Sequence, residues 1–250
     1  MRRVLMSLGV VLGLLVLAVA GVFVSAFAGN APLVAETLPG LGEVVLDGYV
    51  SVAVLDVGEG RYALVDAGNT PSGAPILAAL EAHGAGPDAV VAILLTHGHP
   101  DHVAACGVFP RATVYLLADE IPFATGTRPY LGPLPRILGA RTAPCAALTP
   151  VTDGQSLVVG SRTVEVFAVP GHTAGSAGYL VGDTLFLGDA ARTRADGSPA
   201  GAPWVFSDDV PEDVASLAAL ARRLQGRPLA RVTNAHTGSV PGAAFLALAR

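Results

Sequence analysis

Three of the six histidines of this chain lie within six residues, in the stretch Thr96–His102, which reads THGHPDH. The pattern H-x-H-x-D-H would arise by chance in roughly 2 of 10,000 chains of this composition. Three imidazoles and a carboxylate would pack poorly in an apolar core, whereas both groups are common zinc ligands where thiolates are absent. The cluster therefore predicts a site for a divalent metal ion.

A buried strand is expected to position this cluster. Residues 89–96 read AVVAILLT and are continuously apolar, which is typical of a strand covered on both faces. The histidines follow its carboxyl end, where α/β sheets place their functional sites. In an extended segment His97 and His99 point to the same side, and Asp101 continues the alternation.

Three further candidates follow other predicted strands, and each has a glycine nearby that lets the backbone approach a crowded centre. They are His172 in Pro170–Thr173, Asp189 in Leu187–Ala190 and His236 in Asn234–Gly238. Taken singly, each would more often be an ordinary polar residue at a strand end. Asp66, in the stretch Val65–Gly68, also ends a predicted strand.

In this order, the motifs resemble those of the metallo-β-lactamase-fold superfamily of metallo-hydrolases. The resemblance covers roughly residues 41–250. It implies an α/β (α+β) four-layer αββα sandwich with its site at one edge of the paired sheets. It also implies two divalent metal ions, with Zn²⁺ as the leading expectation and Fe or Mn as alternatives.

The resemblance further implies a role for each site residue. His97, His99 and His172 would hold the first ion; Asp101, His102 and His236 would hold the second; Asp189 would bridge both. Asp66 would orient a ligand by a hydrogen bond. The implied reaction is hydrolysis, in which a metal-bridging hydroxide attacks an ester, thioester or lactone carbonyl and Asp101 orients the nucleophile or carries its proton.

Differences from the motifs of the family's branches narrow the range of expected substrates. An Asp at position 189 disagrees with β-lactamases that use a Cys ligand there, and it resembles glyoxalase II thioesterases and lactonases. Only 14 residues follow His236, too few for the helical glutathione-binding tail of glyoxalase II, and no Tyr directly follows Asp189 as in lactonases. A mononuclear iron, sulfur-oxidising enzyme of this fold and a non-catalytic metal-binding protein remain as alternatives.

The N-terminus predicts export. Residues 4–28 carry no charge after Arg2 and Arg3, and such a run exceeds the roughly 20 residues that span a bilayer. Ala26-Phe27-Ala28 also resembles a signal-peptidase site. We therefore expect a signal anchor or signal peptide over 1–28, a linker over 29–40 and one domain over 41–250. The domain would lie on the extracytoplasmic face of the membrane, with the N-terminus inside, or be secreted or periplasmic if cleaved after Ala28.

Composition excludes several other classes. A formal charge of −5 argues against a nucleic-acid partner, and the absence of Lys among 15 basic residues excludes a lysine nucleophile or Schiff base. The expected partner is a small-molecule substrate, and no protein partner is predicted. Export permits a disulfide between Cys106 and Cys145, but nothing in the sequence shows that the two lie close together.

The remaining strands and helices are expected in two halves of the chain. Strands are expected over 42–49, 51–57, 61–66 and 112–117, hairpins over 155–169 and 177–187, a strand over 229–234, and helices over 72–83, 209–225 and 242–249.

Segment 122–150 holds six prolines and is expected to be an irregular wall or lid, with Arg128, Arg136 and Arg141 forming a solvated face or meeting lipid headgroups. Trp204 and Phe206 are weak candidates for an apolar substrate wall, and anchors for a loop are an equal alternative. Glu120 has no identifiable partner.

Overall fold

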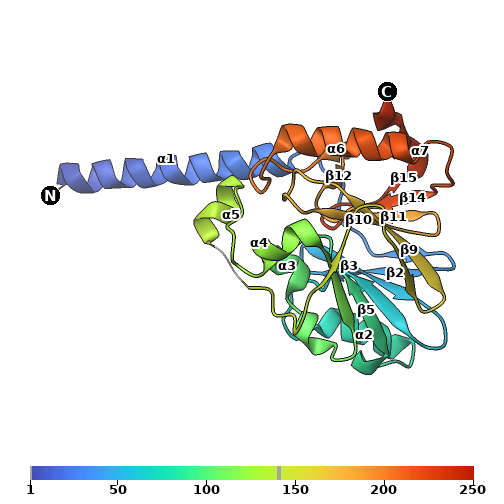
Figure 1. The fold of residues 1–250 in the computed structure, drawn as a ribbon. Coiled ribbons are helices and arrows are strands. Elements are labelled where there is room, and N and C mark those ends of the chain that lie inside the picture. Colours follow the sequence, from blue (N-terminus) through green and yellow to red (C-terminus); the bar gives the residue numbers. More distant parts are fainter. Residues whose placement is uncertain (1, 140–141) are drawn as a thin grey trace.

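The computed structural model describes residues 2–139 and 142–250, and it describes the backbone alone for residues 2–12, 15 and 23. Two sheets face each other and helices cover their outer sides (Figure 1). The helices are α1 (Arg2–Phe27), α2 (Ala74–Ala82), α3 (Pro100–Val103), α4 (Ile121–Ala124), α5 (Pro133–Leu138), α6 (Val210–Arg223) and α7 (Gly242–Leu246).

The first sheet uses the first half of the chain, in the order β1-β2-β3-β4-β5-β6-β7. Its strands are β1 (Glu36–Leu38), β2 (Gly42–Asp47), β3 (Val50–Asp56), β4 (Tyr62–Val65), β5 (Val90–Leu94), β6 (Thr113–Leu117) and β7 (Thr149–Val151). Strands β4 to β7 are parallel, so the carboxyl ends of β4 and β5 lie side by side. This places Asp66 next to the histidine cluster.

The second sheet uses the second half of the chain, in the order β15-β14-β11-β10-β9-β8. Its strands are β8 (Ser156–Val159), β9 (Arg162–Ala168), β10 (Ala177–Val181), β11 (Thr184–Phe186), β14 (Arg231–Thr233) and β15 (Val240–Pro241). Strand β11 is antiparallel to β10 and parallel to β14, so β9, β11 and β14 all end at one edge. A separate hairpin joins β12 (Ala191–Thr193) to β13 (Pro199–Gly201).

Alternating side chains in the strands create the layers. In β3, Val52 and Val54 pack with Leu80 of α2, whereas Leu55 faces the second sheet across the central core. Successive side chains of a strand point to opposite faces, so a strand that is apolar throughout can serve two cores. In the same way the second sheet packs one face against the first sheet and the other against α6 and α7. The four-layer αββα sandwich predicted from sequence is confirmed.

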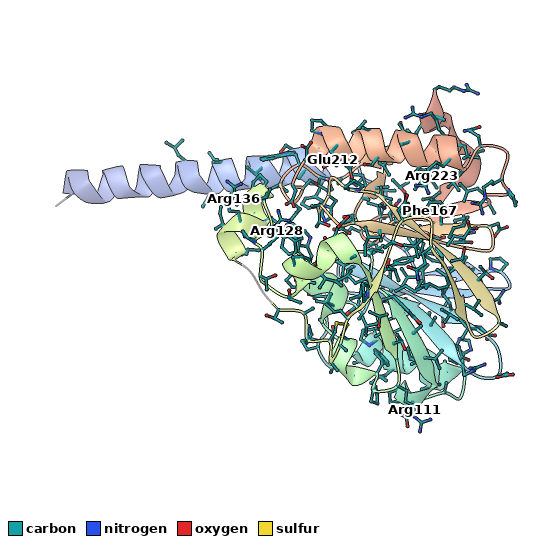
Figure 2. The ribbon with its side chains drawn as sticks, viewed as in Figure 1. Arg111, Arg128, Arg136, Phe167, Glu212 and Arg223 are labelled. Carbon is teal, nitrogen blue, oxygen red and sulfur yellow. A yellow bond between two sulfur atoms is a disulfide. The ribbon has the colours of Figure 1, made fainter. Side chains whose placement is uncertain are left out.

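Helix α6 begins where its capping pattern predicted. The Asp209 carboxylate accepts a hydrogen bond from the Glu212 backbone N–H at 2.9 Å, which satisfies one of the free donors of the first turn. Leu217 and Leu220 on its inner face are buried against the second sheet. Glu212 and Arg223 of this helix are exposed, and the Arg223 guanidinium lies 4.9 Å from the centre of the Phe167 ring (Figure 2).

The N-terminal segment is helical, as expected, over Arg2–Phe27. Across the residues that the structure describes, no helix combines the length and apolar character that a membrane crossing requires. The prediction of a transmembrane helix over residues 4–28 is therefore not supported. The segment 29–40, expected to be a linker, contains β1, which pairs with β2.

The proline-rich segment is more ordered than the sequence suggested, because it contains α4 and α5. Cys106 and Cys145 form a disulfide that ties its far end to the loop after the histidine cluster, so the open question about these cysteines is answered. Arg128 lies over the Phe123 ring at 4.9 Å, and both Arg128 and Arg136 are exposed (Figure 2). Arg141 lies outside the described residues.

Candidate metal centre

Seven candidate ligands converge at one edge of the sandwich, although they come from both sheets. They follow β5 (His97, His99, Asp101 and His102), β9 (His172), β11 (Asp189) and β14 (His236). Their nitrogen and oxygen atoms form three overlapping groups, each with its atoms within 4.8 Å of one another. The structure therefore brings together the seven residues that the sequence named as candidate ligands.

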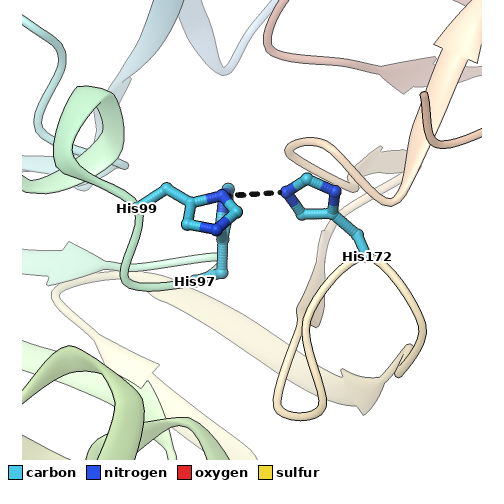
Figure 3. Close-up of side chains that lie close together, drawn as sticks. All are labelled: His97, His99 and His172. Carbon is cyan, nitrogen blue, oxygen red and sulfur yellow. Dashed lines mark hydrogen bonds between the residues drawn. The ribbon is translucent and has the colours of Figure 1, made fainter. Parts of the chain in front are cut away.

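Three imidazoles form the first group. His97 Nε2 lies 2.9 Å from His99 Nδ1, and His172 Nε2 lies 3.2 Å and 3.1 Å from these two atoms (Figure 3). A tetrahedral ion with bonds of about 2.0–2.1 Å holds its nitrogen ligands roughly 3.3 Å apart. The three facing nitrogens fit one such ion.

Burial favours the metal-binding form of these rings. Burial and the neighbouring imidazoles lower the pKa of His99 to about 3, and burial lowers the pKa of His172 to about 4. Burial and the neighbouring imidazoles also hold the pKa of His97 well below its usual value. A neutral imidazole keeps the lone pair that a metal ion needs.

The second group combines two imidazoles with two carboxylates. His236 Nε2 lies 3.4 Å from Asp101 Oδ2 and 3.2 Å from Asp189 Oδ2. His102 Nε2 lies 3.3 Å from Asp189 Oδ1. Asp189 Oδ2 is also 3.6 Å from His172 Nε2, so this carboxylate touches both groups. That position suits an oxygen ligand shared by two ions.

The electrostatics of the second group also fit a cation. Burial opposes a charge on His236, but Asp189 and Asp101 prevail and raise its pKa to about 10. Burial opposes the charge on Asp101 too, yet His102 and His236 lower its pKa to about 2. His102 Nε2 and Asp189 Oδ1, which lie 3.3 Å apart, are among the buried described atoms that have no hydrogen-bond partner. The two carboxylates and these buried atoms offer the negative charge and the ligand atoms that a divalent ion takes.

Asp66 orients the rings of the first motif. Its Oδ2 accepts a hydrogen bond from His102 Nδ1 at 2.8 Å, and its Oδ1 accepts one from the Thr96 backbone N–H at 2.8 Å. The Thr96 hydroxyl also contacts the carboxylate and lies 3.1 Å from His97 Nδ1. Asp66 occupies a left-handed backbone conformation with φ of 63°, which turns its side chain toward the cluster. Such outer hydrogen bonds fix which ring nitrogen faces a metal.

The other histidines have outer partners as well. His236 Nδ1 donates to the Tyr49 carbonyl oxygen at 2.7 Å, and His172 Nδ1 lies 3.3 Å from the Ser207 hydroxyl. Gly188 has φ of 53°, and a Cβ there would lie 2.2 Å from Thr96 Oγ1, so only glycine fits before Asp189. The glycine noted beside this ligand in the sequence thus has a steric reason.

Glu120 has a structural role that sequence reasoning missed. Its buried carboxylate accepts hydrogen bonds from Gly98 N–H at 2.9 Å, Tyr130 Oη at 2.8 Å, Thr173 Oγ1 at 2.8 Å and Gly175 N–H at 3.1 Å. It therefore braces the loop of His97 and His99 and the loop of His172 at once. Burial raises its pKa to about 7 despite these four donors. No sequence signal marks it, because its partners come from three separate loops.

A cavity of about 650 Å³ opens onto the cluster. Four candidate ligands (His99, Asp101, Asp189 and His236) line its floor, and Tyr49, Asn69 and Tyr130 lie beside them. Its wall includes Phe27 of α1, Leu138 of α5, and Phe206. Of the two weak wall candidates, Phe206 lines the cavity, whereas Trp204 is absent from the described lining and donates to Ser25 Oγ at 3.3 Å. Trp204 thus matches the anchor alternative.

Comparisons with known proteins agree with this geometry. The family model described as the metallo-beta-lactamase superfamily matches residues 45–236. A hydroxyacylglutathione hydrolase of Enterobacter sp. (strain 638) is 35% identical over 156 residues, which cover 58% of this chain and 50% of the relative. The chain thus spans about half the length of the curated relatives it matches.

Solved structures share the fold. A subclass B3 metallo-beta-lactamase of Bradyrhizobium japonicum has a TM-score of 0.63 at 18% identity, covering 89% of this chain and 92% of the other. A protein solved in a di-iron-bound form has a TM-score of 0.58 at 25% identity, covering 84% and 96% of the two chains. The similarities confirm the αββα architecture that the motifs implied.

Proposed function

Because the chain belongs to the metallo-beta-lactamase superfamily, we propose that it is a dinuclear metal-dependent hydrolase. The observation that carries this proposal is Asp189, whose carboxylate touches both ligand groups. A mononuclear site would leave the second group of ligands unexplained. The cavity above the cluster gives a substrate access to it, as an enzyme requires. Both alternatives are therefore less well supported.

The proposed ligands follow from these contacts. His97, His99 and His172 would hold the first ion, and Asp101, His102 and His236 would hold the second. Asp189, which lies close to His172, His102 and His236, would serve both ions. Such ions, most simply Zn²⁺ with Fe or Mn as alternatives, would supply polarisation of the substrate oxygen and a lowered pKa of water. The chain's own contribution is to hold these ligands in place through Asp66, Thr96 and Glu120.

Asp101 has a second role in the proposal. Its side chain lines the cavity, and the neighbouring His102 and His236 favour its ionised form by lowering its pKa. A carboxylate at this position would orient the attacking water or carry its proton. Tyr130 is held by Glu120 against the other side of the cavity floor, which orients its ring beside His99.

The proposed substrates are esters, thioesters or lactones. The 35% identity to a hydroxyacylglutathione hydrolase supports a carbonyl substrate with a good leaving group. The likeness to beta-lactamases at 18% identity speaks for the fold alone. We propose an extracytoplasmic location, which the Cys106–Cys145 disulfide supports because such bonds persist in oxidising compartments.

Elemental analysis of the purified full chain tests this proposal first. We expect close to two divalent ions per chain and turnover of at least one substrate from a panel of thioesters, esters, lactones and β-lactams. One iron per chain with sulfur oxidation would replace the hydrolase by the mononuclear alternative. A chain that binds no metal after reconstitution would contradict the ligand assignment itself.

A further inference from the structure

The end of α1 forms one wall of the cavity above the metal site. Phe27 and Asn30 both line the cavity, and the Phe27 ring lies 5.9 Å from the Phe206 ring. Leu138 of α5 lines the same cavity. The wall is thus built from three segments that are remote from one another in sequence.

Several contacts fix this end of α1 to the domain. Ala26 is 1% exposed, and its carbonyl oxygen accepts a hydrogen bond from Arg192 Nη1 at 2.6 Å. After the helix, Ala31 N–H donates to the Thr193 carbonyl oxygen at 2.9 Å. Ser25 accepts the Trp204 hydrogen bond described above. Phe27 lies between these attachments, so its position over the cavity is set by the domain.

The described wall of the cavity is mostly apolar and carries one cationic side chain. Among the described lining residues, Arg192 is the one arginine; its Nη1 donates to the Ala26 carbonyl oxygen and to Asn30 Oδ1, and its Nε is buried without a hydrogen-bond partner. The two carboxylates of the lining, Asp101 and Asp189, lie at the floor. Phe27, Phe206 and Leu138 therefore offer an apolar surface away from the charged floor.

We propose that the substrate carries an uncharged, apolar acyl group that lies against Phe27, Phe206 and Leu138 while its ester, thioester or lactone carbonyl faces the metal site. This proposal rests on the proposed function and adds the substrate class. Phe27 is then a specificity-determining residue supplied by the N-terminal helix. A cavity of about 650 Å³ is of the size that holds a small organic molecule, whose apolar part such walls usually bury.

A series of p-nitrophenyl esters tests the proposal on the metal-loaded full chain. The acyl group is lengthened from acetyl to butyryl, hexanoyl and octanoyl, and kcat/KM is measured for each. Since each buried methylene contributes up to about a fourfold gain, we expect kcat/KM to rise at least about tenfold from acetyl to hexanoyl.

The variant Phe27→Ala should lower the ratio of hexanoyl to acetyl kcat/KM by about tenfold, mainly through KM. Val24→Ala is the matched control, because Val24 lies on the same helix, is 63% exposed and is absent from the described cavity lining. The ratio should stay at its wild-type value in this control. Phe27→Leu keeps an apolar side chain and should recover part of the ratio, which guards against a folding defect in the alanine variant.

Two outcomes would overturn the proposal. A flat chain-length series, or a Phe27→Ala variant that keeps the wild-type ratio, would contradict an apolar acyl site while leaving the hydrolase intact. If a chain with two bound metals hydrolyses none of the esters or thioesters, the proposed function fails and this proposal fails with it.

Discussion

The floor and the wall of the cavity are built in different ways. The floor consists of candidate ligands that follow strands, and the histidines beneath it have fixed positions. His97, His102 and His172 are each at most 1% exposed, and each has a second partner for its other ring nitrogen. The wall consists of Phe27, Leu138 and Phe206, which come from a helix end, a short helix and a loop; Leu138 is 60% exposed. In the proposed function, the chemistry would depend on residues positioned by the sheets, and the selectivity would depend on segments outside them. Such a division allows the wall to change without disturbing the floor.

The largest effect is expected at the shared ligand of the floor. Asp189→Ala removes the carboxylate that touches both groups, and we expect at most one metal ion per chain and a rate lower by roughly 10³ or more, because metals supply several kcal/mol of transition-state stabilisation. Elemental analysis and steady-state kinetics measure both. Asp88→Asn, an exposed carboxylate, is the control. Two bound ions and a wild-type rate in Asp189→Ala would show that this floor residue is needed for neither metal binding nor catalysis, which would contradict the assignment of the chemistry to the floor.

The second effect concerns the brace beneath the floor. Glu120→Ala leaves up to four buried donors without an acceptor, so we expect the free energy of unfolding to fall by about 3 kcal/mol. Glu120→Gln keeps one acceptor oxygen and should lie between the alanine variant and wild type. Denaturant unfolding measures this, with exposed Glu81→Ala as the control. Equal stability of Glu120→Ala and Glu81→Ala would show that the two metal-binding loops do not depend on this carboxylate.

Asp213 tests the junction between floor and wall. Asp213 packs against Gly171, which precedes His172. Its carboxylate also accepts a hydrogen bond at 2.8 Å from the N–H of Ala202, which precedes the wall residue Phe206. Burial raises the pKa of Asp213 to about 7. Between roughly pH 4 and 7 the folded protein therefore keeps a proton that the unfolded chain has lost, so stability falls as pH rises through this window.

Asp213→Asn cannot titrate, and its amide oxygen can still accept from Ala202. We expect its free energy of unfolding to fall less than that of wild type between pH 5 and 7.5, by a difference on the order of 1–3 kcal/mol. Thermal unfolding at several pH values measures this. Glu212→Gln, exposed on the same helix, is the control and should follow the wild-type curve. Parallel curves for wild type and Asp213→Asn would contradict the assignment.

The smallest effect is expected in the wall. Trp204→Phe removes the hydrogen bond to Ser25, which is worth about 0.5–1.5 kcal/mol, and we expect KM for a hexanoyl ester to rise about two- to threefold with metal content at its wild-type value. Ser25→Ala removes the same bond from the other side, so the double variant should add almost nothing. A loss of metal in Trp204→Phe would mean that wall and floor are coupled after all.

Sequence reasoning was more successful for the floor than for the wall. The clustering of the candidate ligands could be predicted because each lies just after an apolar run, and strand pairing places the ends of these runs together. Glu120 could not be found, because its four partners meet only after the loops fold. Phe27 was missed for the same reason: its stretch resembled a membrane or signal segment, and nothing local indicated that its end lies against residues near 192 and 206.

The division of the chain between the two sheets has a thermodynamic consequence. Residues 36–151 form one sheet and 156–241 the other, and the proposed ligands are split between them, four on the first half and three on the second. An ion held by His97 and His172 would join the halves as a cross-link that the unfolded chain lacks. Folding and metal supply would then be linked, so that the folded population rises with free ion by RT ln(1 + [L]/Kd). A cell that withholds the ion would regulate the amount of this protein as well as its activity.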